Sequence, residues 1–527
     1  MPRKRKNTMV DVLEARYCLD DVTLAQRFCN DHNPAISDPA THTPICYVES
    51  LGFAFYDGCK WILPAGKNAE KDSKIRAFKY LIETMQTYKA ELKNELDALK
   101  AKRESSDGDT SQLDNHIEFL EGVISKYPGL NDSKLRGVLN QAPGIPGMLK
   151  TLDDFDRIDA SDVSTWDTLN TPAGLVDLAT GQVYQHIPGR LLTKCTPYAL
   201  NDGYHYDADG RCFWLDTLKE ILPDDEVRDW FERCIGYSLS AIKNHELFVM
   251  LWGSGGNGKT TIIETIKKAL GSDYAIKIDA RSIMTQYKAI ATGEEASPSM
   301  ADLRGVRLAF LSEVKDVDTF DSAKIKDITG GGQIRARRYY ANPITFTPTH
   351  QLMMDSNDIP RLINIDDEGF RRRFVIVPFT QKPKYVDGFK ARINAPETLQ
   401  DCFRWLIDCA IKYHRDGLPI GVGGRDLPRP IYDMLDSYYR EQDYIGTFLA
   451  ECCDIYDDNA RINASELYKA FKAWYTDSWG KIPPNHVKFG TALDGKTITI
   501  GDKTVTIKRK PSHGLNYYYG IRLKVGD

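Results

Sequence analysis

Residues 248–266 read FVMLWGSGGNGKTTIIETI, an apolar run that enters a glycine-rich loop and continues into a helical pattern. From Gly253 to Thr260 the loop matches the spacing G-x-x-x-x-G-K-[ST], which is typical of a phosphate-binding P-loop. Glycines let backbone N–H groups close around phosphate oxygens without a Cβ in the way, and the helix N-terminus adds the positive end of its dipole. The residues that we expect to contact a bound nucleotide are Gly253, Ser254, Gly255, Gly256, Asn257, Gly258, Lys259, Thr260 and Thr261.

The composition of the chain is that of a globular protein. Its 527 residues are 42% hydrophobic and 27% charged, which is enough sequence for about two to four domains, each with its own core. No apolar run approaches the roughly eighteen residues that a membrane span needs, and the basic start Met1–Lys6 lacks the apolar stretch of a signal peptide. The 11 cysteines are scattered without zinc-ligand spacing, so we expect a cytoplasmic protein with no membrane partner.

The sequence before the P-loop predicts a mixed α+β domain over residues 1–213 and a helical collar over residues 214–244. Strand-like runs surround the turn Asp57-Gly58, and a helical pattern extends from Ala69 to Arg103. Two helical patterns in the collar lead directly into the P-loop strand. The nucleotide site is therefore expected to follow a separate N-terminal unit.

After the loop, strand-like and helical patterns alternate, which predicts an α/β core over residues 245–416. Two apolar runs of this core end in polar side chains, Glu313 and Asn357. An acid at a strand end beside a P-loop can bind the Mg²⁺ shell and orient water, and an amide there can sense the γ-phosphate. We therefore expect Lys259 to contact the β- and γ-phosphates, with Thr260 and Glu313 at the metal. The alternative is that Glu313 only caps a turn.

Two basic segments of the core also carry chemistry. Between Glu313 and Asn357, a glycine-rich turn leads into a basic, aromatic strand and predicts a projecting hairpin. Cations and aromatic rings of this kind grip a phosphate backbone and stack on bases. The hairpin residues expected to bind DNA are Arg335, Arg337, Arg338 and Tyr339. After Asn357, the dense group Arg371-Arg372-Arg373 either stabilises a transition state, often in a neighbouring subunit, or is a charged surface.

The Gly/Pro-rich stretch 417–430 predicts a linker, after which residues 431–527 form a separate unit. Helical patterns followed by a β-hairpin pattern predict a winged-helix-like domain. From Arg461 to Asp527 there are twelve Lys/Arg against five Asp/Glu, although the formal net charge of the whole chain is −5. Such a local basic patch is what phosphate binding requires, and a solvated β-rich cap is the alternative.

Taken together, these motifs resemble the superfamily 3 helicases, specifically the primase–helicase family of phages and plasmids that is shared with poxviruses. The P-loop resembles the family's Walker A with its Asn-Gly-Lys, and Leu303–Glu313 resembles its Walker B. Thr329–Arg337 is similar to its hairpin motif, and Asn357 to its sensor 1. Arg372-Arg373, directly before an apolar strand, is similar to its arginine-finger segment.

The chain departs from the family pattern in the hairpin and at its start. Gly332 stands where an acid is usual, and residues 340–342 stand where the family has a basic tip. These differences would shift DNA contact to Arg335, Arg338 or Tyr339. Family members often carry a primase domain before the helicase, and no such pattern precedes it here, so we expect a helicase without its own primase.

The resemblance implies an AAA+-like ATPase core, preceded by a helicase-associated domain, in a DNA helicase that uses ATP and Mg²⁺. It further implies a homo-hexameric ring that translocates 3′→5′ on single-stranded or forked DNA. Its role would be replication of a phage, plasmid or other mobile element, in a bacterial or virus-infected cell, with a separate primase or polymerase. In that scheme Lys259, Glu313 and Asn357 act in catalysis, and Arg372 or Arg373 completes a neighbour's site.

Two other functions fit the same P-loop. A replication initiator would bind and melt an origin through the C-terminal winged helix. A defence or assembly ATPase would hydrolyse ATP without separating strands.

Overall fold

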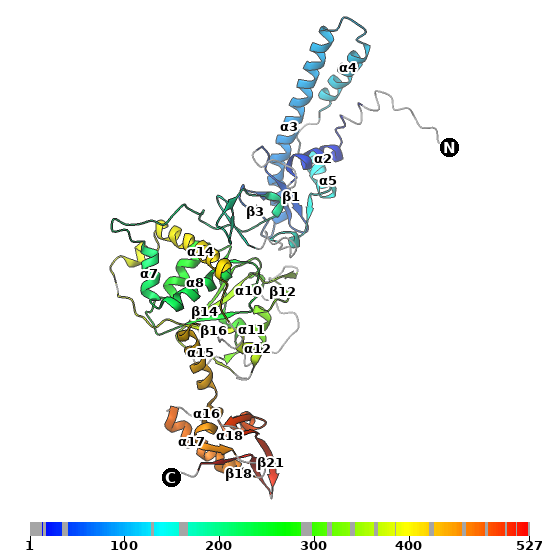
Figure 1. The fold of residues 1–527 in the computed structure, drawn as a ribbon. Helices are drawn as coiled ribbons and strands as arrows, with labels where there is room; N and C mark the ends of the chain where they lie inside the picture. Colours follow the sequence, from blue (N-terminus) through cyan, green and yellow to red (C-terminus); the bar gives the residue numbers. More distant parts are fainter. Residues whose placement is uncertain are drawn as a thin grey trace.

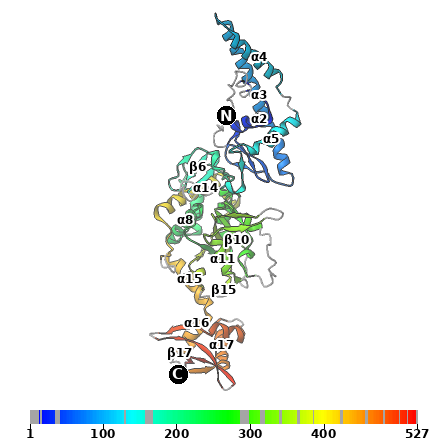
Figure 2. The ribbon, with the colours of Figure 1, turned by 90° about the vertical axis from the view of Figure 1, so that its right-hand side faces the viewer.

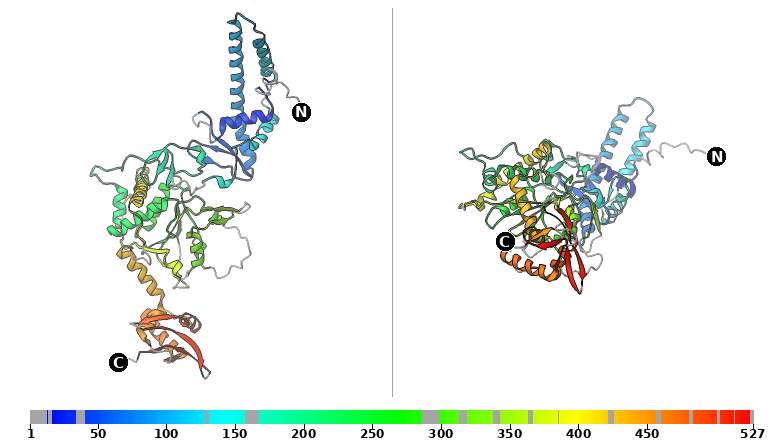
Figure 3. Two further views of the ribbon diagram at one scale, coloured as in Figure 1. Left: turned by 45° about the vertical axis from the view of Figure 1, so that its right-hand side comes forward. Right: turned by 60° about the horizontal axis from the view of Figure 1, so that its bottom comes forward.

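The computed structural model describes Leu13 and residues 17–33, 41–127, 131–156, 167–285, 298–312, 319–337, 343–362, 367–384, 386–420, 426–455, 460–479, 483–500, 503–512 and 514–524. These residues form three units in a row (Figures 1 and 2, and the left view of Figure 3). A helical arm stands at one end, a broad α/β core lies in the middle, and a small helix–sheet unit lies at the other end. No described helix combines the length and apolar character that a bilayer crossing requires.

The N-terminal unit is a four-stranded sheet packed against helices. The strand order is β3-β2-β1-β4, and Phe28 and Phe53 are buried in its core. β2 and β3 pair antiparallel around the predicted turn, where the Asp57 carboxylate accepts hydrogen bonds from the N–H groups of Cys59 and Lys60 at 2.8 and 2.7 Å. The elements are α2 (Asp21–His32), β1 (Ile45–Val48), β2 (Gly52–Tyr56), β3 (Trp61–Ile62), α3 (Ala69–Glu104), α4 (Ser111–Ser125), α5 (Asp132–Gln141) and β4 (Leu149–Lys150).

The predicted long helix is confirmed as α3, which extends one residue beyond the expected end at Arg103. α3 and α4 run side by side and project from the sheet as the arm (Figures 1 and 3). Leu81, Met85 and Leu92 of α3 are buried because its apolar positions recur at three- and four-residue steps.

A small antiparallel sheet and two helices follow this unit in the chain and belong to the α/β core, where Val176, Trp214 and Phe231 are buried together with the strands of the large sheet. α8 begins after Asp224, whose carboxylate accepts hydrogen bonds from the N–H groups of Glu226 and Val227, each at 3.0 Å. α8 then packs closely against α14, and an added Cβ at Gly236 would lie 2.0 Å from the Cys409 carbonyl oxygen. The elements are β5 (Thr168–Thr171), β6 (Gly174–Asp177), β7 (Val183–Tyr184), α7 (Phe213–Ile221), α8 (Asp225–Leu239) and α14 (Pro396–Asp416).

The core is a mixed α/β structure around a five-stranded parallel sheet. The sheet order is β16-β8-β14-β10-β9, and every neighbouring pair is parallel. Most of its side chains are buried, as is typical of a parallel sheet covered on both faces. The strands are β8 (Phe248–Trp252), β9 (Ala275–Lys277), β10 (Leu308–Ser312), β14 (Gln351–Ser356) and β16 (Phe374–Pro378).

The predicted hairpin is present in part, because β12 and β13 pair antiparallel. The apolar run that ends at Asn357 begins at Ile344 and forms two strands, β13 and β14. Pro348 lies between them, and proline cannot donate a hydrogen bond to a ladder. The other core elements are α9 (Lys259–Leu270), α10 (Pro298–Ala301), β11 (Thr319–Phe320), α11 (Ser322–Thr329), β12 (Ile334–Ala336), β13 (Ile344–Phe346), β15 (Arg361–Leu362), α12 (Glu368–Arg371) and α13 (Phe389–Ile393).

Helix α15 (Arg429–Gln442) belongs to the core, which differs from the expected start of a separate unit at residue 431. Its Tyr438 is buried against the ring of Phe374, with ring centroids 5.4 Å apart, and its hydroxyl donates to the Pro360 carbonyl oxygen at 3.0 Å. The C-terminal unit with its own core begins at α16. Its elements are α16 (Tyr444–Cys452), β17 (Cys453–Ile455), β18 (Arg461–Asn463), α17 (Ala464–Trp479), α18 (His486–Leu493), β19 (Thr497–Ile500), β20 (Lys503–Thr506), β21 (Lys508–Ser512), β22 (Leu515–Tyr519) and β23 (Ile521–Leu523).

The close approach of α8 and α14 can be tested by substitution. Gly236→Ala is expected to lower the free energy of unfolding by about 1–3 kcal/mol, because the added methyl group has no room beside the Cys409 carbonyl. Gly122→Ala in α4, where nothing lies within 4 Å of the added Cβ, should instead raise it by up to about 1 kcal/mol. Chemical denaturation measures both, and equal midpoints for the two variants would contradict the close packing.

Candidate nucleotide-binding site

The P-loop connects the end of β8 to the start of α9, between the sheet and the helices of the core. Gly258 has φ +83°, in the left-handed region that disfavours other residues, and an added Cβ there would lie 2.6 Å from Ile221 Cδ1. At Gly253 an added Cβ would lie 2.2 Å from the Phe379 carbonyl oxygen. The loop is therefore tightly packed at both ends, and glycine is required there for space and for conformation.

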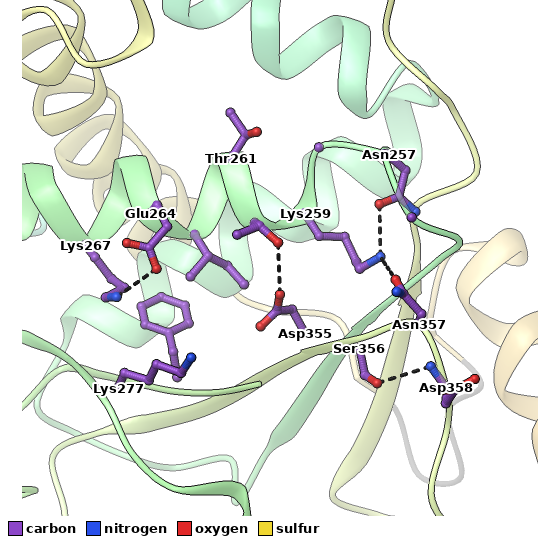
Figure 4. A pocket seen from close by; sticks show the side chains of 16 residues that line it. Asn257, Lys259, Thr261, Glu264, Lys267, Lys277, Asp355, Ser356, Asn357 and Asp358 are labelled. Atoms are coloured by element: carbon purple, nitrogen blue, oxygen red, sulfur yellow. Dashed lines mark hydrogen bonds and ion pairs between the residues drawn. The ribbon is translucent and has the colours of Figure 1, made fainter. Parts of the chain in front are cut away.

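Lys259 lies at the centre of the loop and is only 4% exposed. Its Nζ donates to the Gly253 carbonyl oxygen at 2.6 Å. It also donates to Asn257 Oδ1 at 2.9 Å and to Asn357 Oδ1 at 3.0 Å (Figure 4). Burial lowers the pKa of this ammonium group from its usual value. Three acceptors use its three N–H donors, so the cation is held in place before any phosphate arrives.

Asn257 fixes the loop to the edge of the sheet. Its Nδ2 donates to the Phe379 carbonyl oxygen, just after β16, at 2.8 Å, and the side chain is almost completely buried. Because its Oδ1 also accepts from Lys259, one amide joins the lysine to a second strand end. The Asn that precedes Gly-Lys in this loop thus has a structural task.

The structure brings Asn357 to the P-loop, as the sequence led us to expect of a strand-end amide. β14 lies directly beside β8 in the parallel sheet, so the ends of the two strands meet at one edge. A cavity of about 470 Å³ opens between the loop and this edge, within the range of small-molecule clefts. Lys259, Thr260 and Asn357 all line it.

Asp355 is a residue of this site that the sequence reasoning missed. Its Oδ2 accepts a hydrogen bond from the Thr260 hydroxyl at 3.3 Å (Figure 4), and burial raises the pKa of its carboxyl group. In the sheet register it pairs with Ser312, the last residue of β10. The signal was available, because residues two apart on a strand lie on the same face and Asp355 precedes Asn357 by two.

Several expected site residues cannot be placed. Glu313, Arg338 and Tyr339 lie outside the described residues. Arg335 is exposed on β12, where it pairs with Thr345, and Arg337 directly follows that strand. The described part of the hairpin therefore presents one arginine to solvent and leaves the expected DNA contacts as predictions.

The three arginines before β16 have different environments. Arg373 is buried and forms ion pairs with Glu246, whereas the Arg372 side chain is 64% exposed and contacts Glu246 Oε2 at 2.7 Å. The Arg371 guanidinium lies 4.4 Å from the ring centroid of Tyr439. All three precede β16 and lie at the amino-terminal ends of the parallel strands, whereas the P-loop lies at the carboxyl-terminal ends. The two positions are about 16 Å apart along the strand. These arginines cannot complete the site of their own chain.

Comparison with known proteins identifies distant relatives. A protein-family sequence model described as "Family of unknown function (DUF5906)" matches residues 251–373, from the P-loop strand to Arg373. The chain is 28% identical over 381 residues to a "Putative helicase" of Acanthamoeba polyphaga mimivirus, covering 67% of this chain and 37% of that protein. It is 25% identical over 403 residues to a "Putative primase" of African swine fever virus, covering 70% of this chain and 38% of that protein.

Other comparisons give the same kind of relative. A "Putative helicase" of Invertebrate iridescent virus 3 is 23% identical over 337 residues, covering 58% of this chain and 34% of that protein. The chain thus spans little more than a third of the length of these viral proteins. Among solved structures, the apo C-terminal region of NrS-1 aligns with a TM-score of 0.45 at 10% identity, covering 95% of this chain and 99% of that one. The chain is a distant homologue of viral proteins named as helicases and primases.

The different environments of Arg372 and Arg373 predict different effects on stability. Arg373→Ala is expected to lower the free energy of unfolding by about 2 kcal/mol, because it removes a buried partner of Glu246. Arg372→Ala should cost less than about 1 kcal/mol, since its side chain is mostly in solvent. Urea denaturation of both variants is the measurement, and equal losses would show that Arg373 is not the structural member of the pair.

Proposed function

We propose that this chain is an ATP-dependent DNA helicase that replicates a virus, phage, plasmid or other mobile element. The observation that carries the proposal is the Lys259 ammonium, bonded to its own loop and to Asn357 at the end of the neighbouring strand. A phosphate-binding cation and a γ-phosphate sensor are thereby joined in one unit, which is how a motor couples to the state of its nucleotide. The viral relatives named as helicases support DNA as the substrate.

The strand order supports an AAA+-like core. With β8 as the first strand, the sheet runs fifth, first, fourth, third, second, so the strand that leads to Asn357 lies beside the P-loop strand. Glu313 directly follows β10, the next strand along, and we retain it as the residue that orients the attacking water.

The site fits ATP with Mg²⁺, although among the described residues no three or more His, Cys, Asp or Glu side chains cluster as a metal site. Mg²⁺ takes oxygen ligands and commonly needs only one or two carboxylates when phosphates and water supply the rest. Thr260 and Asp355 would hold the ion, with Glu313 as a further candidate. When bound, Mg²⁺ neutralises charge that develops on the phosphates.

The position of the arginines supports a homo-oligomer, which we propose to be a hexameric ring. Arg372 is exposed just before β16, at the strand ends opposite to the P-loop, where it could reach the site of a neighbouring subunit. Arg373 is less suited to that role because it is buried against Glu246. We therefore propose Arg372 as the finger.

The C-terminal unit supports a winged-helix-like domain. β18 lies between α16 and α17 in the chain, and β21 and β22 follow α18. The resulting three-stranded sheet has the order β18-β22-β21. The initiator alternative would use this domain to recognise duplex DNA.

Loss of the P-loop lysine tests the motor. Lys259→Ala is expected to reduce both ATP turnover and separation of forked DNA by about 100-fold or more, because the site loses its central cation. Lys268→Ala is the matched control, since this exposed lysine of the same helix contacts Asn394 instead. The measurements are ATP hydrolysis and strand displacement on forks with either a 3′ or a 5′ tail.

Each alternative function has its own outcome in this experiment. A wild-type protein that hydrolyses ATP but separates neither fork, with turnover indifferent to single-stranded DNA, would be a non-unwinding ATPase. Specific binding of one duplex sequence without strand separation would favour the initiator.

Asp355→Asn separates metal binding from nucleotide binding. Without divalent metal, the variant should bind ATP as well as or better than the wild type, because a carboxylate that repels phosphates is gone. Adding Mg²⁺ should increase the ATP affinity of the wild type, and this increase should be smaller in the variant by a factor of about ten or more. In electron paramagnetic resonance spectra, the signal of Mn²⁺ bound in the ATP complex should be absent from the variant. Asp327→Asn is the control, because Asp327 is an exposed carboxylate of helix α11 that does not line the cavity. Mn²⁺ binding equal to the wild type would remove Asp355 from the metal site.

A further inference from the structure

The C-terminal sheet presents an outward face of unusual composition. Side chains opposite one another in an antiparallel ladder lie on the same face, and alternate residues lie on the other. Ile462 and Tyr518 are buried on the inner face, at 6% and 1% exposure, so their neighbours along each strand lie on the outer one. The rows across β18, β22 and β21 on that outer face are Arg461–Tyr519–Lys508 and Asn463–Tyr517–Lys510, with Leu515 and Ser512 paired beyond them.

Aromatic rings and cations alternate on this outer face. Tyr517 and Tyr519 are half-buried, whereas Arg461, Lys508 and Lys510 are exposed. The Arg461 guanidinium lies 4.7 Å from the ring centroid of Tyr517, and the Lys510 ammonium lies 5.3 Å from that of Tyr519. These are cation–π contacts at the protein surface.

The same face lacks groups that would repel a polyanion. The strands β18, β21 and β22, all of whose residues are described, contain no aspartate or glutamate. Leu515, at the end of this face, is 53% exposed, which adds apolar surface beside the rings. The unit lies beyond α15, at the far end of the molecule from the α3–α4 arm (Figures 1 and 2).

We propose that the outer face of β18, β22 and β21 binds single-stranded DNA. Unpaired bases would stack on Tyr517 and Tyr519, which stand about 7 Å apart as alternate residues of one strand. Arg461, Lys508 and Lys510 on the flanking strands would contact the phosphates. The guanidinium of Arg461, spread over Tyr517, is itself a planar surface on which a base stacks.

Unpaired DNA fits this face better than duplex DNA. In a duplex the faces of the bases are covered by their neighbours, so half-exposed tyrosines on a sheet face would find no partner. Duplex recognition by protein surfaces relies instead on an element inserted into a groove. The inference goes beyond the proposed function, because it needs neither the nucleotide site nor strand separation.

Fluorescence anisotropy of a labelled oligothymidine with the full-length chain, without nucleotide, tests the proposal. The double variant Tyr517→Ala/Tyr519→Ala is expected to weaken binding about 10- to 100-fold, and the double phenylalanine variant should bind as the wild type does. Tyr184→Ala is the matched control, because Tyr184 is a 45% exposed strand tyrosine of the small sheet β5-β6-β7. An unchanged affinity in the double alanine variant would overturn the proposal.

Charge reversal provides a second variant in case the alanine pair disturbs folding. Lys508→Glu/Lys510→Glu changes only exposed side chains, so the melting temperature should stay near that of the wild type. It should weaken oligothymidine binding at least tenfold and reduce its dependence on salt. A blunt duplex of equal length should compete poorly, and equally good competition by the duplex would show that the face binds backbone alone and would overturn the role of the tyrosines.

Discussion

The buried ammonium of Lys259 is the interaction on which the rest of the site depends. A buried cation is unfavourable unless oxygen atoms replace its water, and here a loop carbonyl, Asn257 and Asn357 supply them. These acceptors belong to the P-loop and to the end of β14, while Asn257 also reaches the end of β16. A phosphate that took the place of one acceptor would move the Lys259 ammonium. Its hydrogen bonds to Asn357, after β14, and to Asn257, which is bonded to Phe379 after β16, would then change together. The geometry thus connects nucleotide binding to the sheet rather than to the loop alone.

The carboxyl-terminal and amino-terminal ends of the parallel strands carry chemically different residues. The carboxyl-terminal end of β14, with Asp355 and Asn357, meets the P-loop, and the arginines before β16 lie at the opposite, amino-terminal ends of the strands. Because the buried strands separate the P-loop from these arginines, the two groups cannot approach each other within one chain. In the proposed assembly, the two groups of residues would become complementary when subunits stand side by side. The distance between them would then be a physical reason for the chain to work as an assembly.

The C-terminal unit adds a different type of surface to the same chain. Its core is separate from that of the α/β unit, and α15 joins the two while packing on β16. The exposed sheet with Tyr517 and Tyr519 would therefore, as proposed, hold a strand of DNA without disturbing the nucleotide site. In a motor, such a surface would keep the strand close to the ring between steps. The overall acidity of the chain does not oppose this role, because basic residues are concentrated in that unit.

The sequence by itself determined the P-loop, the α/β core and the long helix α3, because each depends on local spacing: glycines, period-two runs and three- and four-residue apolar steps. It also indicated Asn357, since a polar residue at the end of an apolar run can be recognised from the sequence alone. Only the tertiary structure decided that Asp355 contacts Thr260, that Arg373 is buried while Arg372 is not, and that α15 belongs to the core. These facts depend on which strands become neighbours, on register and on helix packing. Such pairings join residues far apart in the chain, so no local pattern specifies them.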